Sequence, residues 1–212
     1  MTERTDHYTR FYKSGGWQYE QKREVAFFTR LFGELNLHHG CRVLELGCGM
    51  GRQSAAMASM GYDVTGVEVC AEGVKSAEEQ QTTARFICDS AGNIGDHFGG
   101  ESFDVIYVRG MSWFHYELDG YSPRSGVDVR QKTKFFFEFL KPGGIFILQI
   151  ATDFSGETKN GVLYNTLDKY IDLFSPLGTI IRQTNWAGVE LTDQIQASKV
   201  GGNIIIATRK NK

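Results

Sequence analysis

The run from Val43 to Arg52 carries the residues most able to do chemistry. It reads VLELGCGMGR, with an acidic side chain two residues before the first of three glycines at alternate positions. An apolar stretch that ends in glycines and leads into an alanine-rich segment predicts a strand turning sharply into a helix. Such a turn presents free backbone N–H groups and the positive end of a helix dipole. Residues without a Cβ atom let a ligand lie against that backbone. The sequence therefore predicts a nucleoside cofactor at the first strand-to-helix turn of a Rossmann-like sheet, with a ligand-free tight turn as the alternative.

The spacing of the glycines indicates which cofactor this turn takes. The dinucleotide fingerprint G-x-G-x-x-G needs its third glycine where this chain has Arg52, and Glu45 is foreign to that pattern. The residues ELGCGMG instead resemble the E-x-G-x-G-x-G loop of class I S-adenosylmethionine-dependent methyltransferases. The resemblance covers residues 40–150 and implies S-adenosylmethionine as the cofactor.

The resemblance also implies roles for residues near the turn. Gly47, Cys48 and Gly49 would give backbone contacts to the methionine half of the cofactor, and Glu45 would approach its ammonium group. Glu68 would take both ribose hydroxyls, since a carboxylate accepts two charge-assisted hydrogen bonds from a diol. The alternative for Glu68 is a solvated glutamate at a strand end.

The resemblance extends to the ends of two later strands. Asp89 and Ser90 align with the adenine contact, although an N-cap for a following helix is an equal alternative, and both can hold. Val69 would pack on the adenine face. Val108 and Arg109 would contact the methionine moiety through their backbone groups.

The N-terminal segment 11–20 has two glycines among aromatic residues, which predicts a movable flap. By similarity to family members with an N-terminal lid, Tyr12, Trp17 and Tyr19 would cover the bound molecules. Trp17 is predicted on the cofactor and Tyr12 on the acceptor, while Arg23 would reach the cofactor carboxylate. The alternative is a terminal arm that aromatic residues anchor to the core.

The stretch from Arg109 to Glu117 is the candidate acceptor pocket, because ligands of open α/β sheets bind at the carboxyl ends of strands. Trp113 and Tyr116 are predicted to contact the acceptor. Methyl transfer mainly requires that nucleophile, carbon and sulfur be held in line, and a general base is needed only when the acceptor must lose a proton. His115 is the candidate base because its pKa lies near neutrality, and a packing role is the alternative.

Hydrophobic periodicity predicts an alternating α/β chain. The expected helices are 20–36, 51–60, 71–80, 127–140 and 162–175, and the expected strands are 41–46, 62–69, 84–88, 103–108, 145–150, 178–187 and 203–208. The last two strands are expected to pair antiparallel because no helix is predicted between them. The predicted fold is a seven-stranded, mostly parallel Rossmann-like sheet with an antiparallel last strand and helices on both faces. One domain is expected over residues 1–212, with residues 1–36 as an N-terminal lid and helix extension.

Composition narrows the class of protein. With 23 basic and 25 acidic residues the chain is slightly acidic, which argues against a nucleic-acid partner. No apolar run is long enough to span a membrane, and the start does not resemble a signal peptide. The four cysteines lack C-x-x-C spacing and predict reduced thiols in a cytoplasmic protein. No residues stand at metal-ligand spacing, so no metal is expected.

The absence of two family motifs narrows the acceptor. Residues 109–112 read RGMS where enzymes acting on nucleobase nitrogens or glutamine carry Asn/Asp-Pro-Pro-aromatic, and no proline precedes a cysteine. By elimination, the resemblance implies methyl transfer to an oxygen or nitrogen of a small molecule. A protein or RNA methyltransferase, a nicotinamide oxidoreductase and a non-catalytic S-adenosylmethionine-binding protein remain alternatives, and the oligomeric state stays open.

Overall fold

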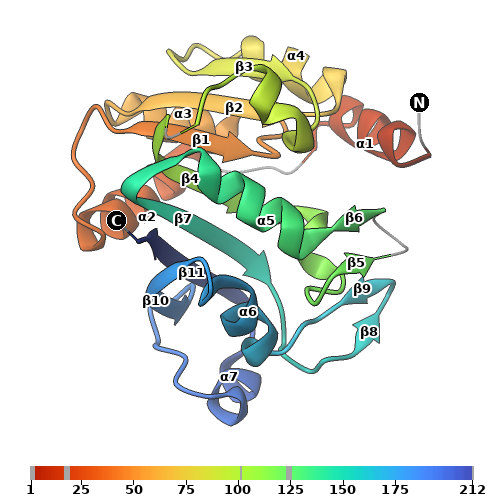
Figure 1. Ribbon diagram of the computed structural model, residues 1–212. Helices are drawn as coiled ribbons and strands as arrows, with labels where there is room; N and C mark the ends of the chain where they lie inside the picture. Colours follow the sequence, from red (N-terminus) through yellow and green to blue (C-terminus); the bar gives the residue numbers. More distant parts are fainter. Residues whose placement is uncertain (1–2, 17–19, 101, 123–125, 212) are drawn as a thin grey trace. The chain divides into compact units, whose positions relative to one another are not determined.

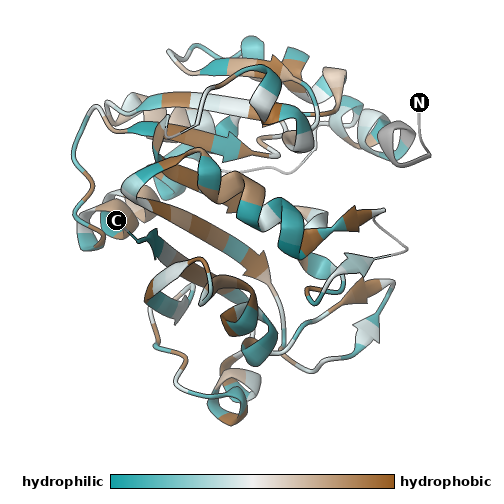
Figure 2. Ribbon diagram, in the orientation of Figure 1, coloured by the Kyte–Doolittle hydropathy of each residue, from teal (hydrophilic) through white to brown (hydrophobic). Residues whose placement is uncertain are grey.

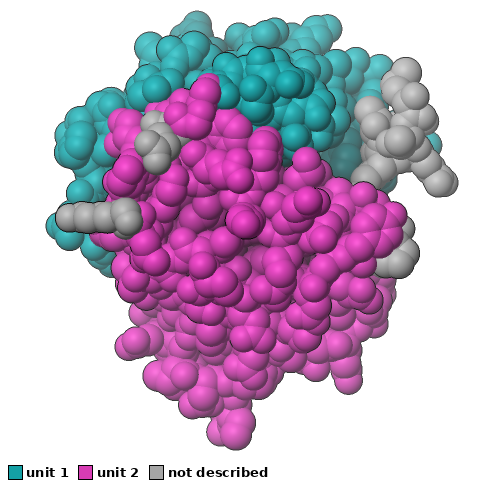
Figure 3. Space-filling view, viewed as in Figure 1, with its two compact units in different colours: residues 1–98 teal, residues 99–212 magenta. Residues whose placement is uncertain are grey.

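The computed structural model describes residues 3–16, 20–100, 102–122 and 126–211 (Figure 1). The chain divides into two compact units, residues 1–98 and 99–212, which are coloured separately in Figure 3.

The first unit is built on three parallel strands. They are β1 (Arg42–Leu46), β2 (Asp63–Glu68) and β3 (Arg85–Cys88), and in their register Leu46 lies beside Val67 and Glu68 beside Cys88. All but the first residue of β1 and of β2 are buried, as expected for strands covered on both faces. The predicted strand-to-helix alternation is confirmed over this unit.

The helices of this unit follow the strands as predicted. They are α2 (Gln21–Glu34), α3 (Arg52–Ser59) and α4 (Ala71–Glu78), with a 3-10 turn η1 (Ala91–Asp96) after β3. Another helix, α1 (Glu3–Lys13), was not predicted, and it packs against α4. Residues 11–13 of the predicted flap continue this helix, and the movement of the flap stays a prediction.

The second unit carries the other four strands of the sheet. They are β4 (Phe103–Arg109), β7 (Leu140–Ala151), β10 (Gly178–Asn185) and β11 (Asn203–Lys210). β4 and β7 pair in parallel, whereas β11 runs antiparallel to both β7 and β10. The strand order of the seven-stranded sheet is β10-β11-β7-β4-β1-β2-β3. The predicted Rossmann-like fold with an antiparallel last strand is confirmed.

Two local predictions in this unit are wrong. A helix, α7 (Gln194–Val200), stands between the closing strands, and the Asp193 carboxylate caps it by accepting from the Gln196 N–H. The helix expected over 162–175 is α6 (Leu167–Phe174), because β9 (Val162–Leu163) pairs with β8 (Thr158–Lys159). A second hairpin, β5 (Tyr121–Ser122) with β6 (Val127–Asp128), leads into α5 (Val129–Glu138).

An aromatic cluster around Phe146 forms the core of the second unit. Strand β7 is hydrophobic along most of its length (Figure 2), and Phe146 on it is fully buried. Its ring centroid lies 5.3 Å from that of Phe137 on α5 and 5.4 Å from that of Phe174 on α6. Phe114 and Phe136 complete the cluster. One side chain thus joins two helices and the loop after β4 to the sheet.

Replacing Phe146 by alanine is expected to lower the free energy of unfolding by about 3–5 kcal/mol, because a large cavity would open in this cluster. Urea denaturation measures the change. The matched control is Tyr121→Ala, since this aromatic side chain is 61% exposed, and its effect should stay within about 0.5 kcal/mol. Equal losses in the two variants would contradict the assignment of the core.

Among the helices of the described ranges, none is long and apolar enough to cross a membrane.

Candidate functional site

The turn after β1 depends on glycine at three positions. Gly47, Gly49 and Gly51 have φ of 73°, 54° and 71°, a region that other residues rarely adopt. A Cβ on Gly51 would fall 2.7 Å from both Ala77 and the ring of Phe86. The missing Cβ of Gly51 therefore lets the turn pack closely against Ala77 and Phe86. Gly47, in contrast, is exposed, so a ligand can approach its backbone.

The peptide N–H groups of the turn are already used inside the first unit. Those of Gly47 and Cys48 both donate to the carbonyl of Val67, at 2.8 and 3.1 Å. That of Gly49 donates to Glu68 Oε2 at 3.1 Å. The prediction of free N–H groups is wrong for these three residues, because the end of β2 supplies their acceptors. A ligand at this turn gains close approach to the backbone rather than these donors.

Glu45 is buried beneath the turn, with a side chain on the sheet that is 1% exposed. Its carboxylate accepts a 2.5 Å hydrogen bond from the hydroxyl of Ser54 on α3. The neighbouring Cys48 thiol is also buried, and burial together with the charges of Glu45 and Glu68 raises the pKa of Cys48. Ser54 was not predicted as part of this group, because nothing in its spacing distinguishes it from other small residues of the helix.

Glu68 holds the end of β2 against the turn. Besides the N–H of Gly49, its carboxylate accepts from the backbone N–H of Cys70 at 2.8 Å. The Tyr12 hydroxyl from α1 lies 3.1 Å from where a Cβ of Gly49 would be, and its nearness to the Glu68 carboxylate favours the ionised form. Burial raises the pKa of Glu68 although these donors oppose the shift. The solvated alternative for Glu68 is wrong, because the residue is only 6% exposed, whereas Val69 beside it is 54% exposed.

Asp89 and Ser90 lie directly after β3. Ser90 caps η1 by accepting from the N–H of Gly92, so the predicted alternative of a cap is confirmed for it. Asp89 Oδ1 accepts from Asn93 Nδ2 at 2.9 Å, and Asp89 Oδ2 pairs with His97 Nε2 at 2.8 Å. The bond from His97 lowers the pKa of Asp89, which keeps this carboxyl ionised. His97 is thus the orienting partner that sequence reasoning did not assign.

The remaining predicted residues of the first unit are Arg23 and the aromatics before α2. Arg23 pairs with Glu20 at 2.9 Å, and its side chain is 84% exposed. Trp17 and Tyr19 lie outside the described residues.

In the second unit, the chain after β4 forms a short 3-10 turn, η2 (Ser112–His115). Val108 is buried in the sheet, and the guanidinium carbon of Arg109 lies 5.1 Å from the ring centroid of Trp186. The ring of Trp113 stacks on Phe136 with an interplanar angle of 9°. These predicted residues therefore share one strand end and the turn that follows it.

Hydrogen bonds fix the backbone on both sides of His115, the predicted base. Asn165 Nδ2 donates to the carbonyls of Phe114 and Tyr116, at 3.4 and 2.9 Å, and the Tyr170 hydroxyl donates to Phe114 as well. Among the described residues His115 Nδ1 is buried without a hydrogen-bond partner. Burial lowers the pKa of His115, so the imidazole is neutral near neutrality. No local pattern points to Asn165, which lies some 50 residues further along the chain.

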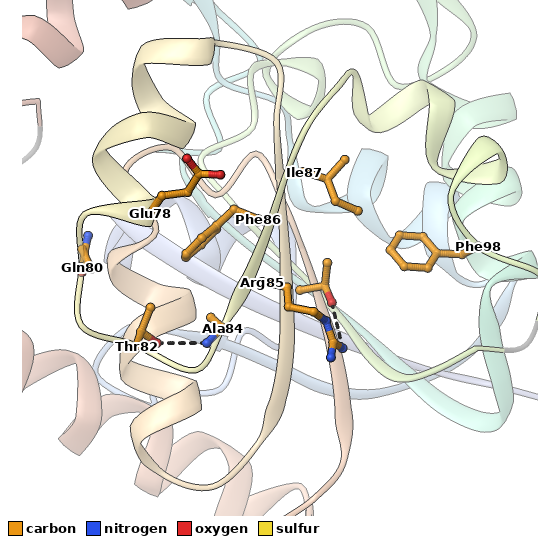
Figure 4. Close-up of a pocket in the computed structure, with 9 residues that line it drawn as sticks. Glu78, Gln80, Thr82, Ala84, Arg85, Phe86, Ile87 and Phe98 are labelled. Atoms are coloured by element: carbon orange, nitrogen blue, oxygen red, sulfur yellow. Dashed lines mark hydrogen bonds between the residues drawn. The ribbon is translucent and has the colours of Figure 1, made fainter.

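A hollow of about 500 Å³ follows the edge strand β3 and contains none of the predicted site residues (Figure 4). Phe86 and Glu78 lie on one side of the strand, with Ile87 and Phe98 on the other. Arg85 on this strand pairs with Asp63 at 2.8 Å. Within the described residues, no group of histidines, cysteines and carboxylates could hold a metal ion.

Comparison with known proteins places this geometry in a class. Residues 44–148 match the family model described as "Methyltransferase domain". Residues 44–148 therefore form a class I S-adenosylmethionine-dependent methyltransferase domain. YqeM of Bacillus subtilis (strain 168), whose name describes a methyltransferase, is 25% identical over 122 residues, 57% of this chain. The match spans about half of that relative, 47% of its length.

Two solved structures are similar over most of the chain. The [4+2]-cyclase SpnF has a TM-score of 0.70 at 15% identity and covers 98% of this chain and 94% of its own. The magnesium protoporphyrin IX methyltransferase from Synechocystis PCC 6803, solved with bound S-adenosylmethionine, has a TM-score of 0.61 at 14% identity. It covers 90% of this chain and 79% of its own. At such identities the likeness concerns the fold.

Proposed function

We propose that this protein transfers a methyl group from S-adenosylmethionine to an oxygen or nitrogen of a small-molecule acceptor. The observation that carries the proposal is the buried Glu68 carboxylate hydrogen-bonded to the Gly49 turn. A carboxylate at this place matches the pattern of the family to which residues 44–148 belong. One hydrogen bond thus joins Glu68, which would accept the ribose hydroxyls, to Gly49, where a ligand can approach the backbone.

The residues present fit such a cofactor because side chains are missing where a nucleoside would lie. Gly47 is exposed, and a Cβ on Gly73 would fall 3.1 Å from both Glu68 Cγ and the Gly49 carbonyl. Gly47, Cys48 and Gly49 would hold the methionine half and Glu68 the ribose. Val69, Asp89 and Ser90 would hold the adenine, with His97 keeping the Asp89 carboxylate oriented.

When bound, the cofactor supplies an activated methyl group on a positively charged sulfur. An acceptor oxygen or nitrogen that gains this methyl group would have to give up its proton to a base or to water. We assign that proton to His115, which is neutral because burial lowers its pKa. Trp113 and Tyr116, on the same turn, would bind the acceptor. Roles for Trp17, Arg23, Val108 and Arg109 stay predictions.

A small acceptor is favoured by the aromatic turn and by the balance of charge. Trp113 offers a flat apolar ring, and the chain carries two more acidic than basic residues, whereas an RNA substrate calls for a basic surface. The direct test supplies the purified protein with methyl-labelled S-adenosylmethionine and a cell extract divided by molecular size. We expect label in the small-molecule fraction, identified by mass. Label found only in macromolecules would instead identify the acceptor as a protein or RNA.

The non-catalytic alternative is examined by the same experiment. SpnF shares the fold and is named for a cyclisation, so the fold alone does not establish methyl transfer. Binding of S-adenosylhomocysteine with no labelled product in any fraction would favour a binding protein over an enzyme.

Glu68→Gln is expected to weaken the binding of S-adenosylhomocysteine by about 10- to 100-fold, because charge-assisted hydrogen bonds to the ribose would be lost. Isothermal titration calorimetry measures the dissociation constant. Glu79→Gln is the matched control, since this exposed glutamate follows α4 and has no proposed role. Unchanged affinity in Glu68→Gln would show that the ribose binds elsewhere.

A further inference from the structure

Helix α3 begins without a cap, directly after the proposed cofactor turn. Its N-cap residue is Gly51, which has no side chain to accept a hydrogen bond from the first N–H groups. The intrahelical hydrogen bonds start with the Ala55 N–H, which donates to the Gly51 carbonyl at 2.8 Å. The N–H groups of residues 52–54 therefore precede the helical pattern. Such donors, together with the positive end of the helix dipole, favour an anion at this end of the helix.

The first turn of α3 carries a basic residue where acidic residues are favoured. Helices α2 and α4 of the same unit have Glu24 and Glu72 in their first turns, whereas α3 has no acidic residue there and begins with Arg52. A positive charge at the positive end of the dipole is unfavourable on its own. An anion bound at this end would offset both the dipole and the charge of the arginine.

The Arg52 side chain has no partner in the part of the chain that the structure describes. Its Nε is completely buried without a hydrogen-bond acceptor, and no described carboxylate forms an ion pair with its guanidinium. Side chains of helical residues lean toward the N-terminus of their helix, so that of Arg52 leans back toward the turn. Charged groups that a fold buries in part are normally paired. Arg52 thus presents an unused positive charge next to the turn.

Gln53, the second residue of α3, is another polar side chain that the fold leaves unpaired. It is 6% exposed, and within the described ranges its amide takes part in no hydrogen bond. Buried polar side chains are in most cases hydrogen-bonded. The next residue, Ser54, follows this rule, because its hydroxyl donates to Glu45. Two successive polar side chains are therefore left for a ligand at an uncapped helix start.

The charges around the turn are complementary to those of the proposed ligand. The methionine half of the cofactor has one anionic group, its carboxylate, beside a positively charged amino group. The acidic side chains of the turn, Glu45 and Glu68, suit the amino group and the ribose hydroxyls. A guanidinium suits the carboxylate, because it donates two parallel charge-assisted hydrogen bonds to the two oxygens.

We propose that the start of α3, with Arg52 and Gln53, binds the carboxylate of the methionine half of the cofactor. This inference rests on the proposed function, because it takes the turn at residues 47–49 as the site of that half. Arg52 would hold the carboxylate through charge-assisted hydrogen bonds, and Gln53 would donate from its amide. The assignment differs from the sequence-based prediction for Arg23, whose side chain is 84% exposed and pairs with Glu20.

Calorimetry with two ligands tests this assignment on the full-length chain. The ligands are S-adenosylhomocysteine and its decarboxylated analogue, in which hydrogen replaces the carboxylate. Arg52→Met should weaken the binding of S-adenosylhomocysteine by about 10- to 100-fold and that of the analogue by less than about threefold. Gln53→Met should produce a smaller loss, about 3- to 10-fold, again only with S-adenosylhomocysteine. Arg52→Lys keeps the charge and should recover part of the affinity.

Arg85→Met is the matched control, since Arg85 is an exposed arginine that pairs with Asp63 and has no proposed role. This variant should bind both ligands as the wild type does, and thermal melts show whether each variant is folded. Equal losses for both ligands in a folded Arg52→Met would overturn the inference, as would unchanged affinity. A carboxylate-specific loss confined to Arg23→Met would assign the carboxylate to Arg23 instead.

The wild type separates a failure of this inference from a failure of the proposed function. No binding of S-adenosylhomocysteine by the wild type would overturn both. If the wild type binds S-adenosylhomocysteine and Arg52→Met binds it equally well, only the assignment of the carboxylate to the start of α3 is overturned.

Discussion

Gly49→Val should reduce the affinity for S-adenosylhomocysteine by at least about 100-fold. Gly49 has φ of 54°, and its missing Cβ would lie 3.1 Å from the Tyr12 hydroxyl. A branched side chain there would strain the backbone and fill the space directly above the turn. Calorimetric titration gives the dissociation constant, and a thermal melt shows whether the variant is folded.

Gly188→Val is the matched control for this experiment. Gly188 also has positive φ, 86°, but a Cβ there would have no neighbour within 4 Å. The control therefore shares the backbone strain without the steric block. If the two variants bind S-adenosylhomocysteine equally well, the turn after β1 is not the cofactor site.

His115→Ala is expected to lower kcat by about 10²- to 10⁴-fold while the affinity for S-adenosylhomocysteine is unchanged. The reason is that His115 would take the acceptor proton, whereas none of the proposed cofactor contacts involves it. Steady-state kinetics on the identified acceptor measure the loss. His38→Ala, at an exposed histidine, should leave kcat unaltered.

The pH profile provides a second measurement on His115. Because burial lowers its pKa below the ordinary value of about 6.5, the neutral form should persist at pH 6.5 and be lost only at lower pH. We expect kcat/KM of the wild type to fall on the acid side below that value, and the profile of His115→Ala to lack this limb. The sign for stability is the same, since protonating the buried ring costs free energy as the pH falls. An identical acid limb in both proteins would remove His115 as the base.

The sheet could be predicted because each strand carried its own signal. The apolar run before Gly47 and the alternation leading to Glu68 specify β1 and β2, and short-range patterns of this kind are independent of distant residues. Helix α7 was missed because it is a single short segment whose cap, Asp193, lies in an otherwise polar stretch. Likewise α6 starts late because β8 and β9 pair with each other, and such pairing is not visible in a local pattern.

The candidate site shows the same division between local and distant information. The glycines at 47, 49 and 51 lie in the sharp strand-to-helix turn that the sequence predicted, and all three have positive φ. The acceptor for the N–H groups of Gly47 and Cys48 is Val67, some 20 residues away, so their use inside the fold could not be foreseen. Tyr12 over Gly49 and Asn165 beside His115 are also long-range neighbours, and a single sequence carries no signal for them.

The buried thiol of Cys48 lies in the turn where an alkylating ligand would bind, so its reactivity toward electrophilic carbon matters. Sulfur attacks electrophilic carbon as the thiolate, and a raised pKa keeps that form scarce at physiological pH. Burial, together with the charges of Glu45 and Glu68, thus disfavours the thiolate and lowers the nucleophilicity of Cys48. We therefore expect Cys48 to react slowly with an alkylating ligand bound at this turn.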